Sequence, residues 1–181
     1  MEKRKVKEFM VPLGEYANVG MEATVLEAIQ ALSKKKDTSG QHKHTTVLVM
    51  DENGTFVSRL TLLDLMAGLE PKYRQISEIN LNRFGYSRDF LQTMLKDYNL
   101  WEHSLEDACK GIPTTKISAI LPKLEKGEYI SANATLDIAV HQMIMTRFHS
   151  LLVTEGEVVV GIVRSIDLFR VFLEKTDACE L

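Results

Sequence analysis

The chain has 181 residues, of which 45% are hydrophobic and 26% are charged, a balance typical of a soluble globular protein. The net charge of -3 gives no whole-chain reason to expect nucleic acid, and no apolar stretch approaches the roughly 18 residues of a membrane span. The basic residues 1–5 are followed by no apolar region typical of a secretory leader. Cys109 and Cys179 form neither a zinc motif nor a disulfide framework. We therefore expect a cytoplasmic protein and exclude membrane proteins and secreted disulfide scaffolds.

The first predicted elements begin a pattern that the chain later repeats. Residues 6–10 have the same apolar spacing as residues 117–121, and Thr24 and Thr135 each follow eighteen residues after the start of these segments. After each threonine, apolar residues recur at i, i+3, i+4 and i+7. They are Val25, Ala28, Ile29 and Leu32 in the first copy, and Leu136, Ala139, Val140 and Met143 in the second. This spacing predicts two amphipathic helices, each with one buried face and with its threonine as N-cap.

Both copies continue with a predicted hairpin and a second helix. The predicted strands are residues 46–50 and 55–57 in the first copy, and residues 150–153 and 158–160 in the second. Tight polar turns separate the strands of each pair, as expected for hairpins. Each hairpin leads into a helix through a matching elbow, residues 60–64 or 163–167. The offset between the copies is 111 residues at Thr24 and Thr135 but 103 residues at Asp64 and Asp167. The first copy therefore has eight extra residues between its first helix and its second. We assign them to a polar surface loop over residues 34–42.

The repeat predicts an α/β (α+β) fold of two β-α-β-β-α units in pseudo-two-fold tandem. The predicted divisions are residues 1–70 for the first unit, 71–116 for a linker and helical insert, and 117–175 for the second unit. A unit of about 55 residues buries too little surface to be stable alone, so we expect the two copies to pack together.

The region between the copies has no counterpart in the repeat. Gly68 and Pro71 are expected to end the first unit, and residues 80–113 form the insert. Its first predicted helix has large apolar side chains on one face, and Ser104 is the expected cap of a short second helix. The apolar side chains are Phe90, Leu91, Met94, Leu95 and Tyr98, followed by Leu100 and Trp101. Two interpretations stay open: the insert is an additional helical layer, or it contacts a cleft and moves when a ligand binds.

These residues resemble a tandem pair of cystathionine-β-synthase (CBS) domains. The family unit opens with a V-x-x-[IF]-M leader, matched by residues 6–10 and, in apolar pattern, by residues 117–121. It continues with D-x-x-G in the hairpin, present as residues 51–54, and closes on G-h-h-[TS]-x-x-D, matched by residues 61–64 in the first copy and by residues 161–167 in the second. The resemblance covers about 115 residues and excludes the insert. It is specific because the leader, the hairpin and the closing motif occur in the same order in both copies.

The resemblance implies a regulatory, energy-sensing module that binds adenine nucleotides (AMP, ADP or ATP), or sometimes S-adenosylmethionine, in clefts between the paired units. In these clefts the Thr61 hydroxyl and a helix N-terminus would receive phosphate oxygens, while the Asp64 carboxylate would accept hydrogen bonds from the ribose diol. Alternatively, Thr61 and Asp64 form a capping box and nothing more.

The resemblance further implies sites that are built crosswise, with the residues just before each first strand contacting the base. One site would join Asn18, Val19 and Gly20 to Arg164 and Asp167, and the other would join Tyr129, Ile130 and Ser131 to Thr61 and Asp64. His149 would lie beside the phosphates or else be a half-buried residue without a ligand role, and Thr45 leads into a strand that borders a cleft.

Two positions depart from the family pattern. Arg164 replaces the phosphate-facing hydroxyl residue of the second copy, and its guanidinium can clamp a phosphate bidentately. Ser58 replaces the family glycine of the first copy, which removes a position where backbone could approach a ligand closely.

The sequence gives no support for a metal site or an active site. His42 and His44 lack a nearby carboxylate or thiol to complete a metal site, and no catalytic motif is present, so we expect neither a metal nor an enzyme.

The closing helices carry more apolar residues than one buried face needs, which favours a homodimer. These residues are Leu62, Leu63, Leu65 and Met66 in the first copy, and Leu168, Phe169, Val171, Phe172 and Leu173 in the second. Two functions remain: a nucleotide-binding regulator of an unknown partner protein, or a structural dimerisation scaffold with clefts that bind nothing.

Overall fold

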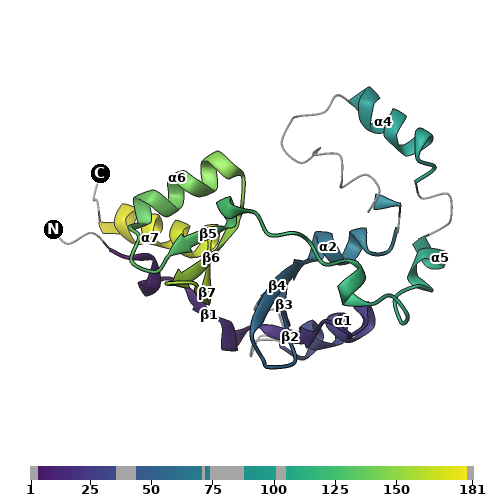
Figure 1. Ribbon diagram of the computed structural model, residues 1–181. Helices are drawn as coiled ribbons and strands as arrows, with labels where there is room; N and C mark the ends of the chain where they lie inside the picture. Colours follow the sequence, from purple (N-terminus) through teal and green to yellow (C-terminus); the bar gives the residue numbers. More distant parts are fainter. Residues whose placement is uncertain (1–3, 36–43, 71, 74–87, 101–104, 179–181) are drawn as a thin grey trace. The chain divides into compact units, whose positions relative to one another are not determined.

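The computed structural model describes residues 4–35, 44–70, 72–73, 88–100 and 105–178. The chain divides into two compact units: residues 16–122, here called the first-repeat unit, and residues 1–15 with 123–181, the second-repeat unit. Each unit has one sheet and one hydrophobic core (Figure 1). The predicted α+β class, with two sheets and flanking helices, is confirmed.

The first-repeat unit has a three-stranded sheet in the order β2-β3-β4, with β2 parallel and β4 antiparallel to β3. The strands are β2 (Ala17–Gly20), β3 (Thr46–Met50) and β4 (Phe56–Thr61). The helices are α1 (Val25–Lys34), α2 (Leu62–Ala67), α4 (Arg88–Asp97), α5 (Leu105–Cys109) and the 3₁₀ turn η3 (Ile117–Ala119). Because α1 follows β2 and α2 follows the hairpin, the unit has the predicted β-α-β-β-α order.

The second-repeat unit repeats this arrangement and adds one edge strand from the N-terminal segment. Its sheet has the order β1-β7-β6-β5, with β5 parallel to β6 and the other pairs antiparallel. The strands are β1 (Val11–Pro12), β5 (Tyr129–Ser131), β6 (Ser150–Glu155) and β7 (Val158–Arg164). The helices are α6 (Leu136–Thr146), α7 (Ser165–Ala178) and the 3₁₀ turns η1 (Val6–Glu8), η2 (Leu13–Glu15) and η4 (Lys126–Glu128).

Helices α1 and α6 begin where the threonines predict. The Thr24 hydroxyl accepts the backbone N–H of Glu27 at 3.3 Å, and the Glu27 carboxylate accepts the backbone N–H of Thr24 at 2.7 Å, which completes a capping box. Thr135 is the N-cap of α6 by position, but its side chain makes no capping hydrogen bond. The expected side-chain cap is therefore present in the first copy and absent from the second.

The hairpins are confirmed: β3 has the predicted bounds, and the other three strands extend further than predicted. Their turns contain Gly54 at φ +76° and Gly156 at φ +61°, the left-handed region that glycine adopts without a steric penalty. Before the first turn, Asp51 Oδ1 accepts the backbone N–H groups of Asn53 and Thr55, both at 2.8 Å. One expectation is wrong: residues 17–20 and 129–131 do not precede the first strand of each unit but form it, as β2 and β5.

The apolar residues of the repeat supply both cores, with one exception. Val25, Ala28 and Leu32 on α1 are buried together with the strand residues of the first-repeat unit, as the helical spacing predicts. Ile29, expected on the same buried face, is instead 39% exposed. The physical reason is that Ile29 lines the groove between α1 and α2, which stays open to solvent.

The leader segments are exchanged between the units. Val6 is fully buried in the core of the second-repeat unit, and Ile117 is fully buried in the core of the first-repeat unit. The two contacts are equivalent: the Val6 N–H donates to the Ala134 carbonyl at 2.9 Å, and the Ile117 N–H donates to the Ala23 carbonyl at 2.8 Å. Each repeat is therefore completed by the leader that precedes the other repeat in the sequence, so the compact units cut across the sequence divisions at residues 70 and 116.

The insert forms helices close to their predicted positions, as α4 and α5. Phe90 and Leu95 on α4 are exposed, whereas Leu100 is buried. The expected cap Ser104, the tryptophan Trp101, Pro71 and residues 36–43 of the polar loop lie outside the described residues. The turn after α5 packs on the first-repeat unit, since the backbone carbonyls of Ile112 and Thr115 accept the N–H groups of Leu26 and Val25.

Candidate functional site

The elbow between β4 and α2 joins Thr61 to Asp64. Asp64 Oδ2 accepts the backbone N–H of Thr61 at 2.7 Å and its hydroxyl at 2.6 Å, while Thr61 Oγ1 accepts the backbone N–H of Asp64 at 3.3 Å. This is a complete capping box, so the structural role considered for this pair is present. Among the described residues, every hydrogen bond of the Asp64 carboxylate uses Oδ2, which leaves Oδ1 as the oxygen that can accept a ribose hydroxyl.

The elbow between β7 and α7 has a different arrangement. Asp167 Oδ2 accepts the backbone N–H of Arg164 at 3.2 Å and its Nε–H at 2.7 Å, and Oδ1 accepts a terminal guanidinium N–H at 2.5 Å. The result is a bidentate ion pair in which the Asp167 side chain is 9% exposed and that of Arg164 is 24% exposed. The two residues expected to bind ribose and phosphate thus bind each other.

The remaining expected residues lie on or next to the strands of the two sheets. Thr46 of β3 is paired with Thr61, which brings the exposed Thr45 next to the first elbow, and Asn18 and Gly20 are exposed on β2. In the second-repeat unit, Ser150 is paired with Arg164. The strand β5 leaves Ser131 exposed, Tyr129 half-buried and Ile130 buried, while Val19 of β2 is half-buried.

His149 lies immediately before β6, the strand that pairs with β7 at the second elbow. Its backbone carbonyl accepts the N–H of Ser165 at 2.8 Å, which fixes the start of α7. The His149 side chain is exposed, whereas the interpretation without a ligand role expected it to be half-buried. Its position beside the Arg164–Asp167 elbow fits the expected place next to a phosphate, although its role in binding stays a prediction.

Gly161 and Ser58 occupy equivalent positions on β7 and β4, and both face a leader segment or the residue that follows it. A Cβ on Gly161 would lie 2.8 Å from the Val11 carbonyl oxygen and from Met10 Sδ, so the leader and its edge strand approach this glycine closely. At the equivalent place in the other unit, the Ser58 hydroxyl donates to the Pro122 carbonyl at 3.4 Å. Ser58 is therefore accommodated by a wider gap between β4 and the segment that follows the leader at residues 117–121, while its expected effect on ligand approach stays a prediction.

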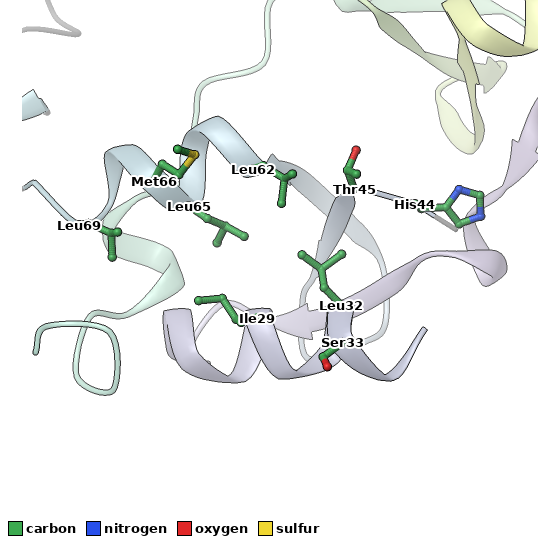
Figure 2. Close-up of a pocket in the computed structure, with 9 residues that line it drawn as sticks. All are labelled: Ile29, Leu32, Ser33, His44, Thr45, Leu62, Leu65, Met66 and Leu69. Atoms are coloured by element: carbon green, nitrogen blue, oxygen red, sulfur yellow. The ribbon is translucent and has the colours of Figure 1, made fainter. Parts of the chain in front are cut away.

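Each unit also has an apolar groove between its two repeat helices. The larger groove, of about 420 Å³, lies between α1 and α2, and Figure 2 shows Leu62 and Leu65 pointing towards Ile29 and Leu32 across it. It is lined by Ile29, Leu32, Ser33, His44, Thr45, Leu62, Leu65, Met66 and Leu69. The smaller groove, of about 130 Å³, is lined by Val140, Met143, Ile144, Ser165, Leu168, Phe169 and Phe172. All seven residues of the smaller groove occupy the repeat positions of residues in the larger one.

His44 closes one end of the larger groove. It is buried, and its ring packs on that of the buried Tyr16 with 4.4 Å between centroids. Its expected partner in a metal motif, His42, lies outside the described residues. Within the described part of the chain no group of three His, Cys, Asp or Glu side chains is placed to hold a metal ion, and no helix there is long and apolar enough to cross a membrane.

Sequence reasoning found the two elbows but missed the pairing of Arg164 with Asp167. An available signal was their i, i+3 spacing at a helix start, which places the side chains of an arginine and an aspartate within reach of one another. The crosswise combination of strand residues from one unit with the elbow of the other stays a prediction.

The comparisons with known proteins identify the domain type. Residues 112–174 match the family model of the CBS domain. A search of curated proteins finds no significant match.

Solved structures share the fold at low sequence identity. A CBS domain-containing protein of unknown function from Bacillus anthracis is 12% identical, with a TM-score of 0.61 over 95% of this chain and 94% of that one. CBSX2 in complex with AMP is 20% identical, with a TM-score of 0.57 over 95% and 98% of the two chains. The cytosolic domain of the Mg²⁺ channel MgtE in complex with ATP is also 20% identical, with a TM-score of 0.56 over 94% of this chain and 49% of that one. Residues 112–174 therefore match the CBS domain, and the chain as a whole shares the fold of solved CBS-domain structures.

Proposed function

We propose that the chain is a regulatory module that binds an adenine nucleotide (AMP, ADP or ATP) in the clefts of its CBS pair and thereby modulates a partner protein in the cytoplasm. The observation that carries this proposal is the presence of a carboxylate at the same place in both repeats, Asp64 and Asp167, at the end of a hairpin and the start of a helix. The solved complexes of CBSX2 with AMP and of MgtE with ATP support the choice of ligand. The module acts by binding and not as an enzyme.

The proposed nucleotide contacts follow the crosswise pattern. One proposed site combines the elbow of Arg164 and Asp167 with residues Asn18, Val19 and Gly20. The other combines the elbow of Thr61 and Asp64 with residues Tyr129, Ile130 and Ser131. At the first elbow the geometry supports a ribose contact through Asp64 Oδ1, because the capping box uses only Oδ2. Binding of a phosphate by the Thr61 hydroxyl requires that hydroxyl to rotate away from Asp64.

We also propose that the chain forms a homodimer through the grooves between its repeat helices. Both grooves expose large apolar side chains, with Leu62 at 46%, Met66 at 57% and Phe169 at 54% exposure. Exposed apolar surface of this kind, repeated in both units, is typical of a protein interface. A second copy of the chain carries the same two surfaces, so it can cover both grooves in a closed symmetric assembly.

Isothermal titration of the purified chain with AMP, ADP, ATP and S-adenosylmethionine tests the ligand proposal. We expect saturable binding of at least one adenine nucleotide. If none of the four binds, the second candidate function, a dimerisation scaffold with empty clefts, is correct. The observation in favour of that alternative is that both elbow carboxylates already have partners in their own helix turns.

A further inference from the structure

The two grooves between the repeat helices have equivalent positions but different contents. The groove between α1 and α2 has a volume of about 420 Å³, and the groove between α6 and α7 has a volume of about 130 Å³. Along the second groove the chain places larger side chains at the repeat positions, namely Phe169 for Met66, Phe172 for Leu69 and Ile144 for Ser33. These larger side chains fill space that stays open in the first repeat.

The side chains that fill the smaller groove also stand out from it. Phe169 is 54% exposed, Phe172 is 52% exposed and Ile144 is 58% exposed. The two phenylalanines are three residues apart on α7, so they lie on one face of that helix. We call these three side chains the Phe169 ridge. The second-repeat unit thus presents an apolar projection, whereas the first-repeat unit presents a groove that is open between the side chains of α1 and α2 (Figure 2).

The exposed apolar surface of the repeat helices is large enough for a stable dimer. Helices α1, α2, α6 and α7 all carry large apolar side chains that are at least 36% exposed. Their exposed parts amount to roughly 1,000 Å² per copy, whereas a standard interface buries roughly 800 Å² per partner. A second copy of the chain is therefore a sufficient occupant for both grooves.

The way in which two copies pair decides whether their interface can be densely packed. If each groove faces the same groove of the partner, two open grooves meet in one contact and two ridges meet in the other. The first contact then encloses a void and the second holds the helices apart, so both lose van der Waals contact. If unlike grooves face each other, the Phe169 ridge of each copy fills the open groove of its partner and removes the void.

We propose that the Phe169 ridge of one copy docks into the α1–α2 groove of a second copy, so that unlike repeats face each other in the homodimer. The two contacts are identical and are exchanged by the two-fold axis of the pair. In each contact Phe169 lies close to the partner's Met66. The inference rests on the proposed homodimer and specifies which surfaces meet in it.

Cross-linking through introduced cysteines tests the pairing in the full chain. All chains carry Cys109→Ser and Cys179→Ser, because these native thiols, of which Cys109 is exposed, would otherwise react. On that background Met66→Cys and Phe169→Cys are made separately, mixed, allowed to exchange subunits and treated with a bis-maleimide of short span. We expect cross-linked dimer from the mixture and none from either chain alone, since the two thiols meet only when unlike repeats pair.

Val158→Cys is the matched control for this experiment. Val158 is 65% exposed but lines neither groove, so its mixture with Met66→Cys is expected to give no cross-linked dimer. Met66 and Phe169 are both more than half exposed, and cysteine at either position is expected to leave the units folded. If circular dichroism shows otherwise, Leu62→Cys and Phe172→Cys replace them as the cross-linking pair, because they line the same two grooves.

The outcomes separate this inference from the proposed dimer. If wild type is a monomer by light scattering at tens of micromolar, the proposed homodimer is wrong and the inference fails with it. If wild type is a dimer but Met66→Cys alone cross-links as completely as the mixture, like repeats pair, and the inference is overturned while the dimer stands. A dimer that cross-links in no mixture, or as readily through Val158→Cys, has its interface elsewhere and overturns the inference as well.

Discussion

The elbow carboxylates Asp64 and Asp167 act on stability as well as on binding, because each is bonded to residues of its own helix start. Asp64 completes a capping box with Thr61, and loss of such a cap costs about 1 kcal/mol. The Asp167 side chain is only 9% exposed and forms a bidentate ion pair with Arg164. Removing the Asp167 carboxylate therefore also removes this ion pair from the Arg164 guanidinium. The same substitution at the two equivalent positions therefore has different consequences for folding.

Replacing each aspartate with alanine separates these effects. We expect Asp64→Ala to lower the free energy of unfolding by about 1 kcal/mol and Asp167→Ala by about 1–3 kcal/mol, with both chains folded. We also expect each variant to lose adenine-nucleotide affinity at one cleft, by roughly 1.5–3 kcal/mol. Urea unfolding measures the first quantity and isothermal titration the second. Two folded variants with wild-type nucleotide affinity would show that the site assignment is wrong.

Glu27 and Asp51 give the chain a predictable sensitivity to acid. The hydrogen bond from the Thr24 backbone lowers the pKa of Glu27, and the hydrogen bond from the Thr55 backbone lowers the pKa of Asp51. A carboxyl group whose pKa is lower in the folded than in the unfolded chain stabilises the fold above its unfolded pKa. That contribution is lost as the pH falls through the folded pKa, so stability decreases below about pH 4.

The substitution Glu27→Gln tests this dependence. Glutamine can still complete a capping box, but it does not titrate. We expect Glu27→Gln to lose less stability than wild type when the pH is lowered from neutral to about pH 3, as measured by the urea midpoint at each pH. Equal losses in the two chains would mean that the Glu27 cap makes no contribution to acid sensitivity.

Among the secondary-structure elements, the leader segments show most clearly what sequence can and cannot predict. The helices and hairpins follow from apolar periods of 3.6 and 2 residues, which are local properties of the chain. The exchange of leaders could not be predicted, since Val6 and Ile117 stand in the same apolar pattern and form equivalent hydrogen bonds in opposite repeats. Nothing in either leader specifies which of two similar cores it completes.

The elbow residues show the same division between local and long-range information. Their positions could be predicted because the repeat places Asp64 and Asp167 at equivalent helix starts. The Arg164–Asp167 pair is also local, at i, i+3, so it could have been expected from spacing. The exposure of Ile29 could not, because it depends on how α1 lies against α2 around an open groove.

The edge-strand contact at Gly161 gives a test at the level of the element. Because a Cβ there would lie 2.8 Å from the Val11 carbonyl oxygen, Gly161→Ser forces β1 and Met10 away from β7. We expect a loss of about 1–3 kcal/mol in the free energy of unfolding, as for other overpacked sites. The equivalent position provides the control: Ser58→Ala removes only a hydrogen bond of 3.4 Å and is expected to cost less than 1 kcal/mol, about the net value of such a bond. Equal unfolding midpoints for Gly161→Ser and Ser58→Ala would contradict this packing argument.

For the whole molecule, the grooves of the two repeats determine the expected assembly. Both lie between the first and the closing helix of their unit, so the repeat has duplicated an apolar surface together with the fold. Large apolar side chains stay exposed in both grooves, among them Met66 at 57% in one and Phe169 at 54% and Phe172 at 52% in the other. Their burial by a second copy would remove apolar area from water, at about 25 cal/mol per Å².

A charge placed in either groove is therefore expected to weaken the dimer. Met66→Glu and Phe169→Glu each place a carboxylate among the apolar side chains of one groove, where its desolvation opposes association. Light scattering at tens of micromolar is expected to give a dimer mass for wild type and a monomer mass for both variants. Val158 supplies the control, because it is equally apolar and 65% exposed but lies in the hairpin at the start of β7, outside both grooves. Val158→Glu is expected to remain dimeric, and a monomeric wild type, or a Val158→Glu chain that dissociates as readily as Met66→Glu, would show that the grooves do not form the interface.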